Sequence, residues 1–238
     1  MKKIRYIIFA PALLLLVFLS GCKIAGLELQ KDFNFESGLR DNSISMNALD
    51  FMKSRKDLFS SMIEAVTYAG MTDEYTKPNR TFLLLTNRAL SDETYFPTAP
   101  SVMGSYFACN QVPNVNYSAT DPTKGPKTLT PDTWSVYPVD KVKAFLQYHI
   151  VTEQVSYYNA LTYATFYPSL AYKGTSDTTK VSFHLVNDRN ATFLINGFTG
   201  SRKVDLSPRT GGIVCTNGVI HVLDDFIIPP TKVILGIK

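Results

Sequence analysis

The chain has 238 residues, of which 24 are lysine or arginine and 20 are aspartate or glutamate, giving a formal net charge of +4. Three of the basic residues, Lys2, Lys3 and Arg5, stand at the N-terminus, so the rest of the chain is close to neutral. This balance excludes a charge-driven nucleic-acid partner, and the length suits one elaborated domain with or without a tether.

The N-terminus has the pattern of an export signal. The basic residues precede an apolar run at 7–19 that is too short to be a comfortable membrane-spanning anchor. The run ends in "LSGC", with Cys22 last, which resembles the lipobox of bacterial lipoproteins. This resemblance implies cleavage before Cys22 and its acylation. We therefore expect a lipoprotein signal peptide over 1–21 and a tether over 22–46. The alternative is an ordinary secretory signal with an incidental cysteine.

Acyl chains on Cys22 would make the membrane a partner of the protein. Several acyl chains hold a protein at a bilayer much more firmly than one does. We therefore expect a lipid-anchored protein of the cell envelope, at the outer membrane, and the sequence leaves open which leaflet it occupies.

Two cysteines remain beyond the lipobox, Cys109 and Cys215. In an exported protein such a pair suggests one disulfide. Two separate buried thiols are the alternative, because sequence alone does not give the distance between the two Cα atoms.

Helical patterns dominate the first part of the domain. Apolar residues between Leu58 and Val66 recur at helical spacing, with Asp57 as a candidate cap and Gly70 as a left-handed stop. A second helix is expected from Asp140, as its N-cap, to His149.

Between the two helical patterns lies a segment rich in proline, asparagine and threonine, residues 91–137, here called the insert. It is much longer than an ordinary loop. It is therefore either an inserted functional loop or a flexible excursion.

Strand patterns follow the second helix. One short strand is expected earlier, and the others are punctuated by Asn-Gly at 196–197 and 217–218. Helices that come first and strands that come later indicate the α+β class. The expected strands are Phe82–Leu85, Val181–Val186, Thr192–Ile195, Gly212–Cys215, Val219–Leu223 and Val233–Ile237.

Three stretches, in order along the chain, resemble the signatures of the fasciclin (FAS1) domain: "RTFLLLTNRAL", "FLQYHIV" and "TNGVIHVLDDFIIPP". The resemblance implies a β-sheet wedge or sandwich with several packed helices over residues 47–238, interrupted by the insert. Two features depart from the family pattern. The insert is long, and Leu85 stands where the first signature usually has a proline.

The resemblance also implies roles for single residues. Tyr148 and His149 form the central motif, which takes part in partner adhesion in some members; a purely structural role is the alternative. Asn217-Gly218 is expected to form a turn with positive φ angles, and His221 to hydrogen-bond within the fold. The sequence-based hypothesis places ligand contacts in the insert, through its aromatic residues Tyr106, Phe107, Tyr117 and Trp134.

The tyrosine-rich run from Tyr157 to Tyr172 divides between two interpretations. Some of its aromatic side chains are expected to fill the core. Others are expected to stack on sugars or to pack against a protein partner.

Signatures of enzymes are absent from the sequence. There is no phosphate-binding glycine loop, no G-x-S-x-G elbow and no ligand set with metal spacing. Asp132 with Asp140, or Asp224 with Asp225, is the weak alternative of a glycosidase pair. We expect a non-enzymatic adhesion or ligand-binding lipoprotein without cofactor or metal, resembling envelope lipoproteins of Bacteroidota. Its ligand would be a protein or a glycan. The main alternative is an accessory glycan-capture component of a nutrient-uptake system, and an envelope enzyme is third.

Overall fold

A computed structural model describes residues 23–24, 27–28, 42–91, 112–114, 116–129, 133–174, 176–186, 192–197, 206–230 and 232. The chain divides into two compact units, Met1–Asp41 and Asn42–Lys238. The described part of the first unit is an antiparallel pair of short strands, β1 (Lys23–Ile24) and β2 (Leu27–Glu28). The predicted signal peptide, with Cys22, lies outside the described residues.

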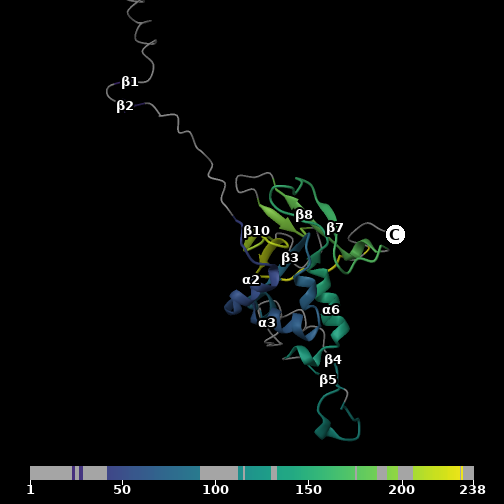
Figure 1. Cartoon of the computed structure of the whole chain (residues 1–238). Coiled ribbons are helices and arrows are strands. Elements are labelled where there is room, and N and C mark those ends of the chain that lie inside the picture. Colours follow the sequence, from purple (N-terminus) through teal and green to yellow (C-terminus); the bar gives the residue numbers. More distant parts are fainter. Residues whose placement is uncertain are drawn as a thin grey trace, which may run out of the picture. The chain divides into compact units, whose positions relative to one another are not determined.

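The second unit begins with two helices joined by a single residue (Figure 1). α2 (Ala48–Ser54) is capped by Asn47, whose side chain accepts a hydrogen bond from the backbone N–H of Asp50 at 2.9 Å. α3 (Lys56–Tyr68) turns an apolar face inward, as its spacing predicts. Its buried residues are Phe59, Met62, Ala65 and Val66.

The ends of α3 test two predictions. Gly70 has a φ of 62° just beyond the helix, which confirms the predicted left-handed stop. The prediction that Asp57 caps α3 is wrong. Because α2 leads directly into α3, Asp57 lies within the first turn and forms an exposed ion pair with Arg55 at 3.0 Å.

A four-stranded sheet forms the centre of the unit, in the order β10-β11-β3-β6. β3 (Arg80–Leu85) pairs in parallel with β11 (Gly218–Leu223), and all six residues of each strand are in register. β10 (Thr210–Cys215) and β6 (Ile150–Val151) complete the sheet as antiparallel neighbours. Every residue of β11 is buried, so the predicted apolar run is a central strand.

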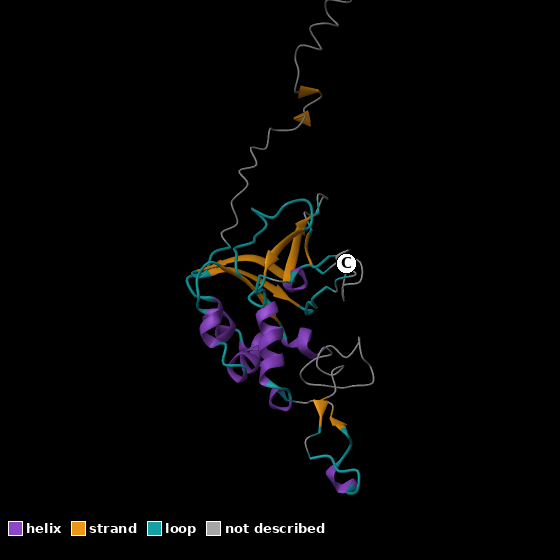
Figure 2. Cartoon of the chain, turned by 90° about the vertical axis from the view of Figure 1, so that its right-hand side faces the viewer, coloured by secondary structure: helices purple, strands orange, loops and turns teal. Residues whose placement is uncertain are grey.

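A three-stranded antiparallel sheet has the order β7-β8-β9. Its strands are β7 (Thr165–Pro168), β8 (Lys180–Leu185) and β9 (Phe193–Ile195), and two of them overlap predicted strands closely. The last predicted strand, Val233–Ile237, lies outside the described residues. Figure 2 shows the strands of the two sheets gathered on one side of the helices.

The remaining elements are short. η1 (Thr72–Tyr75) links α3 to β3, and α4 (Asn87–Ser91) follows β3. α6 (Val139–Tyr148) is the second predicted helix, although Pro138 and not Asp140 stands at its N-cap. η5 (Asp177–Thr179) precedes β8.

The described part of the insert contains local structure. β4 (Val112–Pro113) and β5 (Thr128–Leu129) form a hairpin whose tip holds η3 (Pro122–Lys124). η4 (Trp134–Val136) then leads to α6. In Figures 1 and 2 the hairpin lies beyond the helices, on the side away from the sheets.

One apolar core joins helices and sheets. Met62 of α3 lies against the end of β3, where its sulfur accepts a hydrogen bond from the Leu85 N–H at 3.0 Å. Phe82 on β3 and Ile220 on β11 are fully buried and face each other in the strand register. Burial of one such side chain stabilises the fold by about 1.5–3 kcal/mol. The mixed helix and sheet content confirms the α+β class.

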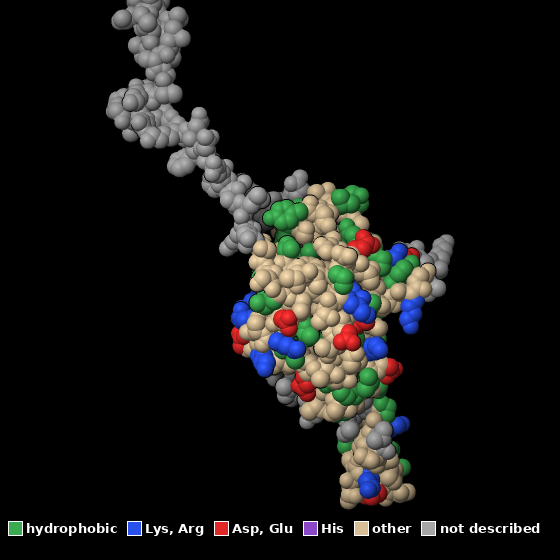
Figure 3. Space-filling view, in the orientation of Figure 1, with side chains coloured by type: hydrophobic (Ala, Val, Ile, Leu, Met, Phe, Trp, Pro, Cys, Tyr) green, Lys and Arg blue, Asp and Glu red, His purple; other side chains and the backbone are tan. Residues whose placement is uncertain are grey.

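Charged side chains lie on the outside of this core. On the face drawn in Figure 3, basic and acidic side chains are interspersed, and no broad patch of one sign appears among the described residues. This distribution agrees with the near-neutral charge of the chain beyond its first five residues. Among the described residues, that face therefore offers no broad single-sign patch to a strongly acidic or basic partner.

Candidate functional site

Tyr148 is a core residue with only 3% of its surface exposed. Its hydroxyl donates to the carbonyl of Lys180 at 3.1 Å and accepts from the side-chain nitrogen of Asn196 at 2.9 Å. Asn196 holds a left-handed φ of 52°, and its oxygen accepts from the N–H of Ser182 at 3.0 Å. Burial raises the pKa of Tyr148. The hydroxyl is therefore a protonated link between α6 and the second sheet.

His149 is fully buried immediately after α6. Its Nδ1 donates to the Phe145 carbonyl at 2.8 Å, and its Nε2 accepts from the N–H of Ile227 at 3.2 Å. Burial lowers the pKa of His149 to about 4. The neutral ring thus satisfies one acceptor and one donor of the backbone.

These positions correct one prediction about the central motif. A partner cannot reach Tyr148 or His149, because the fold covers both side chains. The hypothesis that they contact a partner does not fit the structure, and the alternative of a structural pair does.

His221 makes the corresponding connection on the other side of the core. Its Nε2 donates to the Val155 carbonyl at 2.9 Å, and its Nδ1 accepts from the N–H of Gly212 at 3.2 Å. The ring stacks on Phe193 of β9, with 4.9 Å between centroids. Burial lowers its pKa to about 4. His221 therefore joins β11 to β10 and to the second sheet, as its predicted structural role requires.

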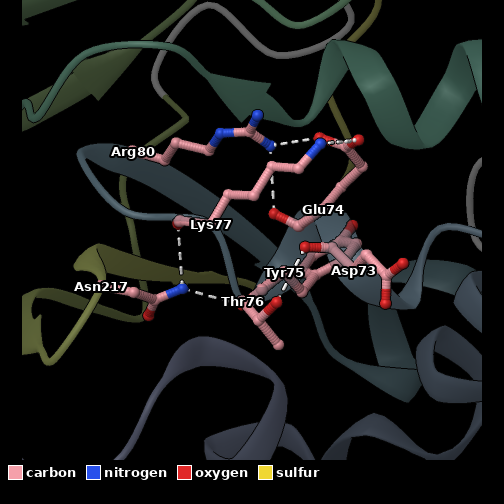
Figure 4. Close-up of polar contacts among 7 residues, drawn as sticks. All are labelled: Asp73, Glu74, Tyr75, Thr76, Lys77, Arg80 and Asn217. Carbon is pink, nitrogen blue, oxygen red and sulfur yellow. Dashed lines mark hydrogen bonds and ion pairs between the residues drawn. The ribbon is translucent and has the colours of Figure 1, made fainter.

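Asn217, at the turn between β10 and β11, holds separate segments together, and Figure 4 shows its contacts with Tyr75 and Lys77. Its side-chain nitrogen donates to the carbonyls of Tyr75 at 2.9 Å and Lys77 at 3.2 Å. Its side-chain oxygen accepts from the N–H of Ala48 at the start of α2, at 3.0 Å. Asn217, the asparagine of the "TNGVIHVLDDFIIPP" stretch, thus connects α2 and the segment that begins with η1 to the turn between β10 and β11.

The turn itself differs from the prediction. Asn217 does not have a positive φ, whereas Gly218 has a φ of 157° and begins β11. A Cβ at Gly218 would collide with the carbonyl of Arg80 on the neighbouring strand. Glycine is required here because two parallel backbones approach closely.

Beside this joint lies a small ionic cluster, also drawn in Figure 4. Glu74 pairs with Lys77 and with Arg80, both at 2.6 Å. Although desolvation opposes it, the two cations lower the pKa of Glu74 overall. Since Arg80 opens β3, the cluster fastens η1 to the first residue of the strand.

The buried motif residues lie in the part of the chain that matches a known family. Residues 127–229 match the family model described as "Fasciclin domain". The fasciclin resemblance is confirmed over this range. The range includes Tyr148, His149 and His221, whereas the "RTFLLLTNRAL" stretch precedes it.

One solved structure that is similar to the chain is described as "Novel Fold Revealed by the Structure of a FAS1 Domain Pair from the Insect Cell Adhesion Molecule Fasciclin I". The sequence identity is 13% and the TM-score 0.47, and the match covers 76% of this chain and 50% of that chain. The match thus spans half the length of the insect domain pair. No curated protein matches the chain.

Trp134, at the end of the insert, belongs to the apolar core of the second unit. It is 1% exposed, and its Nε1 donates to the Ser61 carbonyl on α3 at 3.0 Å. Tyr137 is also buried and lies 6.2 Å from it between ring centroids. The prediction that Trp134 offers a stacking surface to a ligand is therefore wrong, because the indole fastens the insert to α3.

Tyr117 is the one predicted insert contact that the described residues show at the surface, with 43% exposed. It lies in the β4–β5 hairpin. The side chain of Asn114 holds this hairpin together by donating to the carbonyls of Lys124 at 2.8 Å and Pro126 at 3.0 Å. The predicted contacts Tyr106 and Phe107 lie outside the described residues.

A second group of exposed apolar side chains follows α6 and lies within the range that matches the fasciclin model. Tyr158 is 74% exposed and Tyr163 is 65% exposed, and Leu161 and Phe166 are exposed between and beyond them. We call these four residues the aromatic loop. The sequence suggested that part of the tyrosine-rich run faces outward, but periodicity did not indicate which residues, since this stretch is neither regular helix nor strand over most of its length.

Hydrogen bonds hold the aromatic loop in place. Asn159 donates to the Gln154 carbonyl at 2.7 Å and accepts from the Ser156 N–H at 2.6 Å. Further along, the carbonyl of Leu161 accepts from the N–H of Leu185 on β8 at 2.8 Å. A loop ordered in advance loses less conformational entropy when it binds a partner.

Cys215 is a free, buried thiol, which corrects the disulfide prediction. Its sulfur donates to the Asn217 side-chain oxygen and to the Gly218 carbonyl, both at 3.2 Å. Desolvation by burial is the largest influence on the thiol and raises its pKa. The proposed partner, Cys109, lies outside the described residues.

Of the two acidic pairs considered for catalysis, the structure describes both members of Asp224–Asp225 but only one member of Asp132–Asp140. Asp224 accepts from the Thr86 hydroxyl at 2.8 Å, and Asp225 accepts from the N–H of Phe226 at 2.9 Å. Asp140 is exposed in the first turn of α6, and Asp132 lies outside the described residues. In the described ranges no cluster of three or more His, Cys, Asp or Glu side chains could hold a metal ion.

Proposed function

We propose that the chain is an envelope-anchored lipoprotein whose fasciclin domain acts as a non-enzymatic adhesion or ligand-binding module. The observation that carries this proposal is the contrast between the buried motif residues and the exposed aromatic loop. Tyrosine is enriched where proteins bind partners, since its ring supplies contact area and its hydroxyl tolerates water.

The anchor is proposed from the sequence. Acylation of Cys22 would hold the domain at a membrane through the tether, and no helix in the described ranges is long and apolar enough to cross a bilayer. Cys22→Ala in the full chain should shift the protein from the detergent phase to the aqueous phase. Retention of the variant in the detergent phase would contradict lipid anchoring.

The binding role is tested separately. We expect Tyr158→Ser/Tyr163→Ser to abolish binding of the full chain to any ligand found on protein and glycan arrays, while its circular dichroism spectrum stays unchanged. Both side chains are exposed, so their replacement leaves the core intact. The matched control is Tyr117→Ser, which removes an exposed tyrosine of the insert.

The two variants separate the two candidate surfaces. Loss of binding in the aromatic-loop variant alone supports the proposal. Loss in Tyr117→Ser alone would return the ligand contacts to the insert. Turnover of an array glycan by the wild-type chain would contradict a non-enzymatic module.

A further inference from the structure

A polar pocket of about 310 Å³ lies at the carboxyl ends of the two parallel strands. β3 and β11 run in register to their last pair, Leu85 and Leu223, and the N–H of Thr86 still donates to the Leu223 carbonyl at 3.0 Å. Beyond this point the two segments diverge, into α4 on one side and into 224–225 on the other. The pocket lies where the two segments diverge. Its polar lining residues are Arg88, Ser207, Arg209, Asp224 and Asp225.

One carboxylate in the pocket is held in a fixed position. The Thr86 hydroxyl donates to Oδ1 of Asp224 at 2.8 Å, and Arg209 approaches both oxygens of Asp224 at 3.4 Å. A strong charge-assisted hydrogen bond between guanidinium and carboxylate is about 2.7–2.9 Å long. Arg209 is therefore close to Asp224 without a short bond to it, and most of its five N–H donors remain for other acceptors.

Arg88 is the second guanidinium that lines the pocket. It belongs to α4, and among the described residues none forms an ion pair or hydrogen bond with its side chain. An arginine fork with unused donors matches the two oxygens of a carboxylate.

The charges of the lining restrict the ligand. Among the described lining residues there are two arginines and two aspartates, so their formal charges balance. A doubly charged phosphate would meet Asp224 and Asp225 as well as the guanidiniums, and like charges repel. A ligand with one carboxylate for Arg88 and hydroxyl groups for the aspartates satisfies both signs.

The size and the polarity of the pocket further restrict which ligand fits it. The part of the lining that the structure describes is mainly polar, with Leu206 and Pro208 as its apolar residues, so an apolar side chain would gain little by entering. The volume is at the lower limit of ordinary ligand pockets, about 300 Å³. It suits one six-membered ring bearing hydroxyl groups and one carboxylate.

We propose that this pocket binds a uronic acid residue, with its carboxylate on Arg88 and Arg209 and its hydroxyl groups donating to Asp224 and Asp225. The pocket is built from α4, the 206–209 segment and the end of β11, whereas the aromatic loop follows α6. The proposal is therefore independent of whether the aromatic loop binds a partner.

The test is saturation-transfer NMR on the full chain in detergent micelles, with free glucuronate, glucose and N-acetyl-aspartate amide as observed probes. Inorganic phosphate has no carbon-bound proton, so it is the fourth probe, measured by its competition with glucuronate. We expect transfer to glucuronate, little to glucose, and about tenfold or weaker binding of glucuronate in Arg88→Met, since hydrogen bonds to charged groups are the strong ones. Arg209→Met is the second variant and should weaken glucuronate binding in the same way.

Arg55→Met is the matched control. Arg55 is also an exposed arginine beside an aspartate, but it lies at the start of α3 and does not line the pocket. Unchanged glucuronate binding in this control supports the assignment.

Four results would overturn the proposal. These are no transfer to glucuronate, equal transfer to glucose, equal weakening in Arg55→Met, and tighter binding of phosphate or of N-acetyl-aspartate amide. The last would assign the pocket to an inorganic anion or to an acidic peptide. If the circular dichroism spectrum shows that one arginine variant does not fold, the other variant and the comparison of the four probes on the wild type still test the proposal.

Discussion

The closing strand and the aromatic loop both lie in the range that matches the fasciclin model, and they have opposite surroundings. All six residues of β11 are buried, and its histidine uses both ring nitrogens inside the fold. The aromatic loop exposes Tyr158 and Tyr163 by well over half of their surface. The residues that identify the family are thus the ones that build the domain, and the residues available to a partner lie between the signatures.

The largest effect that this comparison predicts is on Asn217. Asn217→Ala removes the acceptor for Ala48 and the donor for Tyr75 and Lys77, leaving buried backbone groups without partners. We expect the free energy of unfolding to fall by about 3–5 kcal/mol, at about 1–3 kcal/mol for each unsatisfied group. Urea denaturation measures it.

The matched control is Asn116→Ala, because Asn116 is exposed in the hairpin. Its stability should stay within about 0.5 kcal/mol of the wild type. Equal effects of the two substitutions would contradict the role of Asn217 as a joint.

The buried histidines predict a loss of stability in acid. His149 and His221 have pKa values of about 4 in the fold against an ordinary 6.5, so the unfolded chain binds more protons between these two values. Their contribution is complete above pH 6.5 and is lost as the pH falls toward 4. Near pH 4, protonation of the unfolded chain at each of the two histidines should therefore lower the free energy of unfolding by about 3 kcal/mol.

Denaturation curves at several pH values between 7 and about 4 test this directly. His149→Gln and His221→Gln should each reduce the slope of stability against pH, although both lower stability at neutral pH. A slope that stays the same in both variants would contradict proton exclusion as its cause.

Trp134→Phe should have a smaller effect. The substitution retains an aromatic ring but removes the donor to the Ser61 carbonyl. We expect a loss of about 1–2 kcal/mol in the free energy of unfolding. Tyr117→Phe, at the exposed residue of the same insert, should cost almost nothing, and a loss equal to that of Trp134→Phe would contradict the different placement of the two residues.

The smallest effect is expected in the aromatic loop. Tyr158→Ser/Tyr163→Ser should leave the thermal midpoint unchanged within error, since neither side chain contributes to the core. A large drop in the midpoint would show that the loop supports the fold and would weaken its assignment to a partner.

Much of the fold follows from the sequence because its patterns are local. Short strand-like runs and turn residues marked β8, β9, β10 and β11, and helical spacing of apolar residues marked α3 and α6. The parallel pairing of β3 with β11 was not predicted, since no local pattern specifies a partner more than 130 residues away.

The candidate sites were less predictable. Trp134 and Tyr117 are both aromatic residues of the insert, and only packing against α3 distinguishes the buried one from the exposed one. Arg88, Arg209 and Asp224 come from separate segments with no shared motif, and the pocket exists only after β3 and β11 align.

The pairing of β3 with β11 also affects the order in which the domain can fold. Arg80 and Gly218 are neighbours in the sheet although most of the domain separates them along the chain. Contacts of such long range make folding slow, because a large loop must close before they form. A ribosome or an export channel would have to release nearly the whole polypeptide before the central sheet is complete. Until then β3 presents an unpaired apolar edge of the kind that chaperones cover.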